Sequence, residues 1–257
     1  MRILCNGCSF TYGGQLPEDR RIAAAWPSQL AEIVNDSVVD NISFSGSSNL
    51  EIFLRTLRQI QQHNYDLIIV QWSSFRRHWF EPNLDRLYIC AGATEDGLRD
   101  WSSNTIYLSA AERRKFYNTL TMLTGDYRES VDLITFCNTL KSLMKPGQHV
   151  VFVNGLVPWG KDLVQLDDPT DMYKSMSKFT KDMLEFDFKD DHEILKYYQD
   201  LNNKLVPMQD DWINMTDAWK KNLIDRATDN LHPGEKSHRW LAEKIKQHLI
   251  DKKIIFC

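Results

Sequence analysis

The chain has 257 residues, of which 42% are hydrophobic and 26% are charged, as in an ordinary globular domain with a sizeable core. A net charge of -4 offers no general attraction to nucleic acid or to an anionic membrane surface, so we expect neither partner. No apolar run is long enough to span a bilayer, and the opening MRILCNGCSF turns polar too early for a signal-peptide core. We therefore expect a cytoplasmic protein.

Strand and helix patterns alternate through the first part of the chain. The sequence predicts strands at 2–5, 37–43 and 66–72, and helices at 26–34 and 47–63. The strand at 66–72, DLIIVQW, is apolar over most of its length, as expected for a central strand covered on both faces. The apolar side chains of the second helix share one face, which we expect to be buried: Leu50, Phe53, Leu54, Leu57 and Ile60.

The same alternation continues to the C-terminus. A helix is predicted at roughly 110–145 and another at 191–205, and strands are predicted at 149–155 and 211–217. The final helix, 233–253, has Pro233 at its first position, and its apolar face consists of Leu241, Ile245 and Leu249.

Alternating helices and apolar strands predict a mostly parallel sheet between two helical layers, a three-layer α/β/α sandwich. No repeat or flexible linker divides the chain, so we expect a single domain over 1–257. Two irregular segments, at about 75–110 and 156–190, are expected to be insertions into this domain.

Ligands bind such sheets at the carboxyl ends of the strands, so the segments that follow the predicted strands are the candidate site. Each of them carries small, hydroxyl-bearing or ionisable side chains. These segments are NGCSFTYGG, FSGSSN, SSFRRH, GLVPWG and DNLHPG.

Ser9 follows the first strand between Gly7 and Gly13. A serine on a tight turn after a strand presents its hydroxyl at the sheet edge beside free backbone N–H groups, which is the setting of a nucleophile. A serine of an ordinary turn fits the same short pattern.

Asp229 and His232 lie three residues apart in DNLHPG, directly before the last helix. At this spacing the carboxylate can hold one imidazole nitrogen while the other faces the sheet edge, as in the base half of a serine triad. The alternative is structural: Asp229 forms a turn and His232 caps the helix.

Together these segments resemble the SGNH, or GDSL-type, hydrolases. GCSFTYG is similar to the block with the nucleophile, with Ser9 at the serine and Cys8 where the family usually has aspartate. NISFSGSSN is similar to the second block, with Gly46 at the oxyanion glycine. DNLHPG matches the D-x-x-H-P block, with Asp229 and His232 as the remaining triad members.

The resemblance implies a five-stranded flavodoxin-like sheet and hydrolysis of carboxylic esters through an acyl-enzyme. The implied substrates are small molecules or glycans that carry ester groups, including O-acetyl groups on carbohydrate. The implied oxyanion hole contains the N–H groups of Ser9 and Gly46. No cofactor or metal is implied.

The third block of this family, G-x-N-D, differs here. In VQWSSFRRH, Ser74 falls at the position of the asparagine that donates to the oxyanion, and Trp72 replaces the glycine. Removal of one such donor typically lowers the rate by ~10²–10³. Ser73, Ser74, Gln71 or an arginine could supply the missing donor. The W-S-S-x-x-R pattern is similar to divergent phage-like and microbial members of the family.

Arg76 and Arg77 directly follow this block and are candidates for binding an anionic substrate group, with Trp72 as a candidate stacking surface. The alternatives are ion pairing of the arginines with the acidic insertions and packing of the tryptophan in the core. The insertions themselves are candidates for substrate walls, a lid or a homo-oligomer surface.

Cys5 and Cys8 form a C-x-x-C pair, which could indicate redox or zinc chemistry. Cys5, however, lies within a predicted strand, where its thiol would be buried and inert, and no second ligand pair with zinc spacing is present. An odd count of five cysteines also argues against a disulfide framework.

Two other functions fit the same residues. A chain without the third-block asparagine could be a carbohydrate- or partner-binding protein that keeps the pocket but has weak activity or none. An acyltransferase would use the same triad but exclude water.

Overall fold

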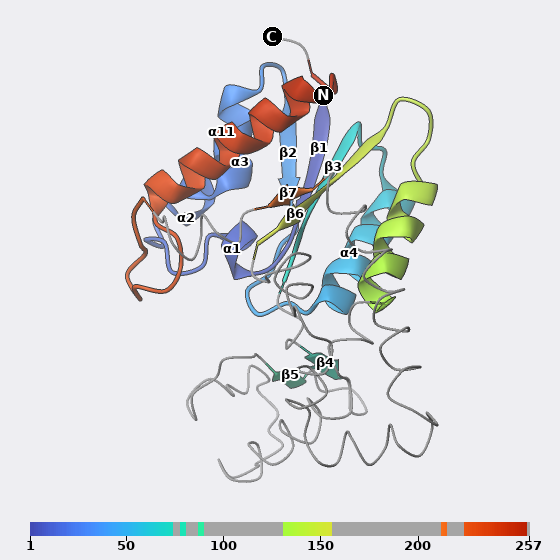
Figure 1. Ribbon diagram of the computed structural model, residues 1–257. Coiled ribbons are helices and arrows are strands. Elements are labelled where there is room, and N and C mark those ends of the chain that lie inside the picture. Colours follow the sequence, from blue (N-terminus) through green and yellow to red (C-terminus); the bar gives the residue numbers. More distant parts are fainter. Residues whose placement is uncertain (74–77, 81–86, 90–130, 156–211, 215–223, 256–257) are drawn as a thin grey trace, which may run out of the picture.

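A computed structural model describes residues 1–73, 78–80, 87–89, 131–155, 212–214 and 224–255 (Figure 1). Most of the two predicted insertions, the predicted helix at 191–205 and the first part of the helix at 110–145 lie outside these residues. Within the first insertion, β4 (His78–Phe80) and β5 (Leu87–Ile89) pair as an antiparallel ribbon.

The centre of the molecule is a parallel sheet of five strands in the order β2-β1-β3-β6-β7. The strands are β1 (Arg2–Asn6), β2 (Val38–Asn41), β3 (Leu67–Trp72), β6 (His149–Asn154) and β7 (Ile213–Asn214). Numbered along the chain within this sheet, the order is 2-1-3-4-5, the flavodoxin-like arrangement. The predicted fold class is therefore confirmed.

Helices cover both faces of the sheet (Figure 1). On one face lie α3 (Trp26–Ile33) and α11 (Glu235–Asp251), together with the short α2 (Arg21–Ala24). On the other face lie α4 (Asn49–Gln62) and a helix that runs through 131–142. The one-turn helix α1 (Ser9–Tyr12) directly follows β1.

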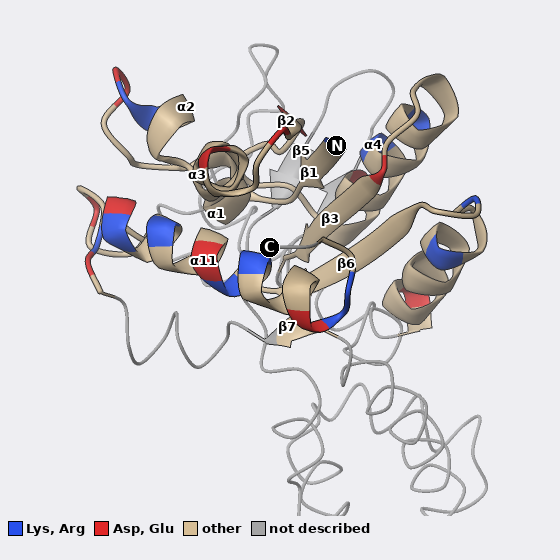
Figure 2. Cartoon of the chain, turned by 90° about the horizontal axis from the view of Figure 1, so that it is seen from above, with Lys and Arg blue, Asp and Glu red and all other residues tan. Residues whose placement is uncertain are grey.

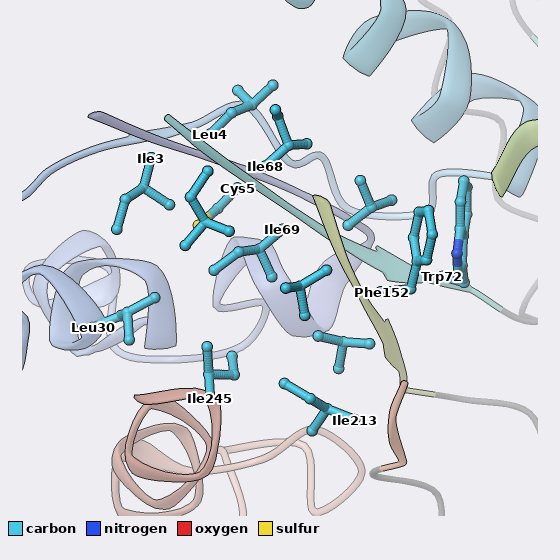
Figure 3. Close-up of a cluster of buried hydrophobic side chains, with 14 of the residues drawn as sticks. Ile3, Leu4, Cys5, Leu30, Ile68, Ile69, Trp72, Phe152, Ile213 and Ile245 are labelled. Atoms are coloured by element: carbon cyan, nitrogen blue, oxygen red, sulfur yellow. The ribbon is translucent and has the colours of Figure 1, made fainter. Parts of the chain in front are cut away.

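The core forms where these layers meet the apolar strands (Figure 3). Every residue of β3 is buried, because the strand lies in the middle of the sheet and has helices on both sides. On the α4 side, Phe53 stacks on Phe136 of the 131–142 helix with ring centroids 4.4 Å apart. On the other side, Leu241, Ile245 and Leu249 of α11 are fully buried, as predicted for its apolar face.

Two details of the predicted helices are wrong. In α4 the side chains turned to the sheet include Ile52 and Thr56, both fully buried, whereas Leu50 and Leu54 are 39% and 41% exposed. The reason is polar: Asn6 of β1 donates to the Ile52 carbonyl and to Thr56 Oγ1, at 2.8 and 2.9 Å. Pro233 precedes α11 instead of starting it.

The outer face of α11 carries charges of both signs along its length (Figure 2). Arg239 contacts Glu243 on the same helix and Glu32 on α3, both at 3.2 Å. Exposed pairs of this kind contribute ~0–1 kcal/mol each, so the buried apolar face holds the helix in place. Among the described residues, no helix is long and apolar enough to cross a membrane.

A histidine lies in the packed interface between α3 and α11. His238 is fully buried, and its Nδ1 accepts a hydrogen bond of 3.1 Å from the N–H of Trp26 at the start of α3. Burial lowers the pKa of His238 to about 3; His232 also lowers it, and Asp225 partly opposes the change. The imidazole is therefore neutral in the folded protein.

We predict that this histidine makes the fold sensitive to acid. The unfolded chain binds a proton at His238 near pH 6.5, whereas the folded chain binds it only near pH 3. The stabilisation of the folded state by the neutral histidine is therefore complete above pH 6.5. It declines by about 1.4 kcal/mol per pH unit below that value. His238→Asn, which keeps an acceptor but does not titrate, should flatten the fall in unfolding free energy between pH 6.5 and 5, measured by urea denaturation. His63→Asn, at an exposed position, should retain the wild-type slope. Parallel curves for wild type and His238→Asn would refute this prediction.

Candidate active site

Ser9 lies at the carboxyl end of β1 as the first residue of α1, and its side chain is buried. The chain turns through Gly7 and Cys8, and a side chain at Gly7 would place its Cβ 2.1 Å from Thr11 Oγ1. A glycine is therefore required for the helix to start this close to the strand. The first N–H groups of a helix have no partner within it, so Ser9 combines a hydroxyl with free backbone donors.

The structure brings Ser9, His232 and Asp229 together. His232 Nε2 lies 3.0 Å from Ser9 Oγ, and His232 Nδ1 lies 2.5 Å from Asp229 Oδ2. The side chains of His232 and Asp229 are 20% and 25% exposed. The arrangement is that of a hydroxyl, a base and a carboxylate that orients the base, which is the geometry needed to remove the proton from the serine.

The carboxylate of Asp229 is held by its own turn. Oδ1 accepts the N–H groups of Leu231 and His232, both at 3.0 Å, which leaves Oδ2 for the imidazole. Burial alone would raise the pKa of Asp229, but these two N–H groups and His232 together lower it below its usual value. Asp229 is therefore ionised and fixes the imidazole with Nδ1 protonated and Nε2 free to accept.

The loop that carries these two residues is closed on itself. Ala227 donates to the His232 carbonyl at 2.9 Å, and Asn230 donates to the Ala227 carbonyl at 3.0 Å. Asn230 has a φ of 58°, a left-handed conformation that asparagine tolerates better than most residues, and Arg226 donates to its carbonyl at 2.8 Å. The relative positions of Asp229 and His232 are thus set by local bonds.

Asp225 ties this loop to α11. Its carboxylate accepts the N–H groups of Lys236 and Ser237 at 3.0 and 2.8 Å, and so caps a helix whose own N-cap residue, Gly234, has no side chain. A Cβ at Gly234 would lie 2.5 Å from Asp225 Cγ. The glycine therefore provides the space that the capping carboxylate occupies.

Gly14 and Phe10 flank the Ser9–His232 contact. Gly14 donates to the Ser9 carbonyl at 2.7 Å, and a Cβ at this position would lie 3.0 Å from Ser9 Cβ and 3.5 Å from His232 Cδ2. The ring of Phe10 lies 5.2 Å from the imidazole, centroid to centroid. These contacts limit the positions that the imidazole can take beside the serine.

Gly46, the predicted oxyanion glycine, lies in a turn after β2. It has a φ of 85°, and Ser47 donates to the Phe44 carbonyl across the turn at 3.4 Å. Phe44 in turn donates to the Gly7 carbonyl at 3.2 Å, which anchors the turn two residues before Ser9. Among the described residues the N–H of Gly46 has no hydrogen-bond acceptor.

The segment after β3 is described only as far as Ser73. Ser73 is fully buried, and Asn49 at the start of α4 bonds its main chain twice, accepting its N–H at 2.7 Å and donating to its carbonyl at 3.1 Å. Ser74, Arg76 and Arg77 lie outside the described residues, so their predicted roles stay predictions.

Trp72 belongs to the core. Its side chain is 1% exposed and packs against Phe152, with ring centroids 5.8 Å apart (Figure 3). It also contacts Phe136, at a centroid distance of 6.4 Å. The predicted stacking of this tryptophan on a substrate is therefore corrected: the last residue of a central strand faces the helical layer that covers the sheet.

The two cysteines near Ser9 are both fully buried. Cys5 lies within β1, as predicted, and burial raises its pKa well above the usual value, so the thiol is protonated. Cys8 is the N-cap residue of α1, where its carbonyl accepts the N–H groups of Thr11 and Tyr12. Neither thiol has the exposure that redox chemistry requires.

The sequence does not reveal the buried residues whose contacts hold the segments that carry the site. No sequence motif points to Asn49, Thr11 or Gly14. Gln71 was considered only as an alternative oxyanion donor, although a polar residue inside the apolar run LIIVQW is itself an indication of a buried polar contact.

Solved structures with a similar fold share little sequence with this chain. A variant of Axe2, an acetyl xylan esterase from Geobacillus stearothermophilus, has a TM-score of 0.50 at 10% identity and covers 96% of this chain and 94% of its own. The psychrotrophic esterase EstA from Pseudoalteromonas sp. has a TM-score of 0.49 at 12% identity, and the match covers 98% of this chain and 97% of EstA. A member of the lipolytic protein G-D-S-L family from Veillonella parvula has a TM-score of 0.45 at 14% identity, and the match covers 96% of this chain and 97% of that protein.

The chain has the fold of the SGNH hydrolases. The likeness to Axe2 and the strand order of the sheet confirm the predicted resemblance at the level of the fold. No model of a known protein family matches the sequence, and no curated protein sequence matches it.

We predict that Gly234→Ala destabilises the protein. The added methyl group would force the Asp225 carboxylate away from the start of α11, at a cost of about 1–3 kcal/mol in the free energy of unfolding. Lys236→Ala changes an exposed side chain on the same turn and should stay within about 0.5 kcal/mol of wild type. Urea denaturation compares the three proteins. Equal stability of Gly234→Ala and wild type would contradict this account of the cap.

Proposed function

We propose that this protein hydrolyses carboxylic esters through an acyl-enzyme formed on Ser9. One observation carries the proposal: His232 lies within hydrogen-bond distance of both Ser9 Oγ and Asp229 Oδ2. The three residues come from opposite ends of the chain and meet at the edge of the sheet where α/β folds bind their ligands.

In the proposed first step, Ser9 Oγ attacks the ester carbonyl carbon while His232 Nε2 takes the hydroxyl proton. Asp229 stabilises the imidazolium, and the carbonyl oxygen becomes the oxyanion of a tetrahedral intermediate. When this collapses, the bond to the alkoxy oxygen breaks, and His232 returns its proton to the departing alcohol. Water, deprotonated by His232, then attacks the acyl-enzyme, which releases the acid and restores Ser9.

The proposed oxyanion donors are the N–H groups of Ser9 and Gly46. Ser9 starts a helix, and the Gly46 turn is anchored to Gly7 through Phe44. Both donors are backbone groups held by other bonds, so they need little reorganisation as charge develops. Ser74 is the proposed third donor, in place of the asparagine of the family, and Arg76 and Arg77 are proposed to bind an anionic part of the substrate.

The proposed substrates are small esters, in particular O-acetyl groups on carbohydrate. The fold likeness to an acetyl xylan esterase supports this class. The hydrolysis needs no group beyond the triad, the oxyanion donors and water.

Hydrolysis of p-nitrophenyl acetate tests the proposal directly. Ser9→Ala removes the nucleophile and should lower kcat by at least about a thousandfold. Ser142→Ala, at an exposed serine far along the chain, should hydrolyse at the wild-type rate. A fluorophosphonate probe should label wild type stoichiometrically and leave Ser9→Ala unlabelled.

Other outcomes would point to the alternative functions. Equal hydrolysis by wild type and Ser9→Ala would refute the mechanism. Labelling of Ser9 with ester consumption only when an acceptor alcohol is added would identify an acyltransferase. The absence of both labelling and hydrolysis, with glycan binding that Ser9→Ala leaves unchanged, would identify a binding protein.

Gly14→Ala should impair the reaction without unfolding the protein. The new Cβ would lie 3.0 Å from Ser9 Cβ, closer than normal van der Waals contact, so Ser9 must shift by a few tenths of an ångström relative to His232, and we expect kcat to fall by at least about tenfold. Gly147→Ala is the control: it has a φ of 84°, which strains an alanine, but open space around it, so it should lower stability and leave kcat unchanged. An unchanged kcat in Gly14→Ala would show that this contact does not hold the catalytic pair.

A further inference from the structure

A buried glutamine in the central strand of the sheet contacts the helix that begins with the proposed nucleophile, Ser9. Gln71 is the fifth of six residues in β3, and its side chain is fully buried. A buried amide that loses its hydrogen bonds to water destabilises a protein by ~1–3 kcal/mol unless the fold replaces them. An apolar residue of similar size would avoid this penalty, so the bonds that Gln71 makes indicate what it does.

Gln71 is bonded to the helix that carries Ser9. The hydroxyl of Thr11, also fully buried, donates to Gln71 Oε1. Thr11 lies two residues after Ser9 in α1, so the bond connects the middle strand of the sheet to the one turn of helix on which the nucleophile lies. The other amide atom, Nε2, has no acceptor among the described residues, so only one end of the amide is satisfied there.

Two glycines leave room for this contact. A Cβ at Gly7 would lie 2.1 Å from Thr11 Oγ1 and 3.1 Å from Gln71 Cβ, and a Cβ at Gly155 would lie 2.2 Å from Gln71 Nε2. The glutamine thus lies between the residues that follow β1 and β6, where no side chain competes for the space.

The helix itself is too short to fix its own orientation. It has four residues, and no side chain caps its N-terminus. Two further side chains reach its main chain: Asn41 donates to the Thr11 carbonyl at 3.3 Å, and Arg21 donates to the Tyr12 carbonyl at 3.4 Å. Both bind carbonyl groups in the second half of the helix, whereas the Gln71–Thr11 bond ties it to the sheet from within the core.

We propose that Gln71 is a positioning residue for Ser9. Through Thr11 it holds α1 so that Ser9 Oγ stays at hydrogen-bond distance from His232 Nε2. The inference rests on the proposed ester hydrolysis and adds to it a buried contact that sets the reactivity of the nucleophile. It predicts that loss of this bond slows the attack of Ser9 without weakening substrate binding.

Two variants remove the bond and a third keeps it. Gln71→Met keeps the size of the side chain without its polar atoms, Thr11→Val removes the hydroxyl, and Thr11→Ser retains it. Thr56→Val is the matched control, because Thr56 is another fully buried threonine that accepts from a buried amide, Asn6 Nδ2, but lies on the α4 side. Each variant is measured for kcat and KM with p-nitrophenyl acetate, for the rate of labelling by a fluorophosphonate, and for hydrogen exchange of the α1 amides.

We expect Gln71→Met and Thr11→Val to lose about ten- to a hundredfold in kcat and in labelling rate, with KM within about twofold of wild type. Their α1 amides should exchange faster. Thr11→Ser should behave as wild type, and Thr56→Val should lose stability with an unchanged kcat. Unchanged exchange in α1, or an unchanged kcat with faster exchange, would overturn the proposal. Wild type that neither hydrolyses esters nor labels would overturn the proposed function, and faster exchange in the variants would then show a structural bond alone.

Discussion

The contact between His232 and Ser9 joins residues 223 positions apart, and the rest of the site depends on it. It requires the segments after β1 and before α11 to meet at one edge of the sheet. Parallel strands provide this, because all their carboxyl ends lie on the same side. The 3.0 Å separation is therefore a consequence of topology first and of local geometry second.

The positions of Ser9 and His232 are each set by hydrogen bonds within and next to the segment that carries the residue. On one side, Gly7 lets α1 begin directly after β1, and Gln71 ties that helix to the middle of the sheet through Thr11. On the other side, Asp229 accepts two N–H groups of its own turn and one from the imidazole, so the carboxylate and the base form one unit. Hydrogen bonds that are satisfied before the substrate arrives leave little to be reorganised during reaction.

The mostly parallel sheet, its helical layers and the three residues brought together at the sheet edge could be predicted from sequence. Hydrophobic periodicity predicts the sheet and its helical layers, and the short motifs around Ser9 and His232 carry the resemblance that implies the flavodoxin-like strand order. The supporting residues could not, because their contacts cross the chain: Asn49 is 24 positions from Ser73, and Thr11 is 60 from Gln71. Periodicity also failed in α4, where a polar contact from Asn6 turned Thr56 to the sheet in preference to Leu54.

Hydrogen bonds connect the segment after the Gly46 turn with the end of β3. Asn49 lies three residues after Gly46, and its amide exchanges two bonds with the main chain of Ser73, next to the position where the family carries its third donor. Asn49 at the start of α4 therefore ties the segment that follows the Gly46 turn to the end of β3. In this chain, the end of β3 as far as Ser73 is thus held by a side chain of the second block.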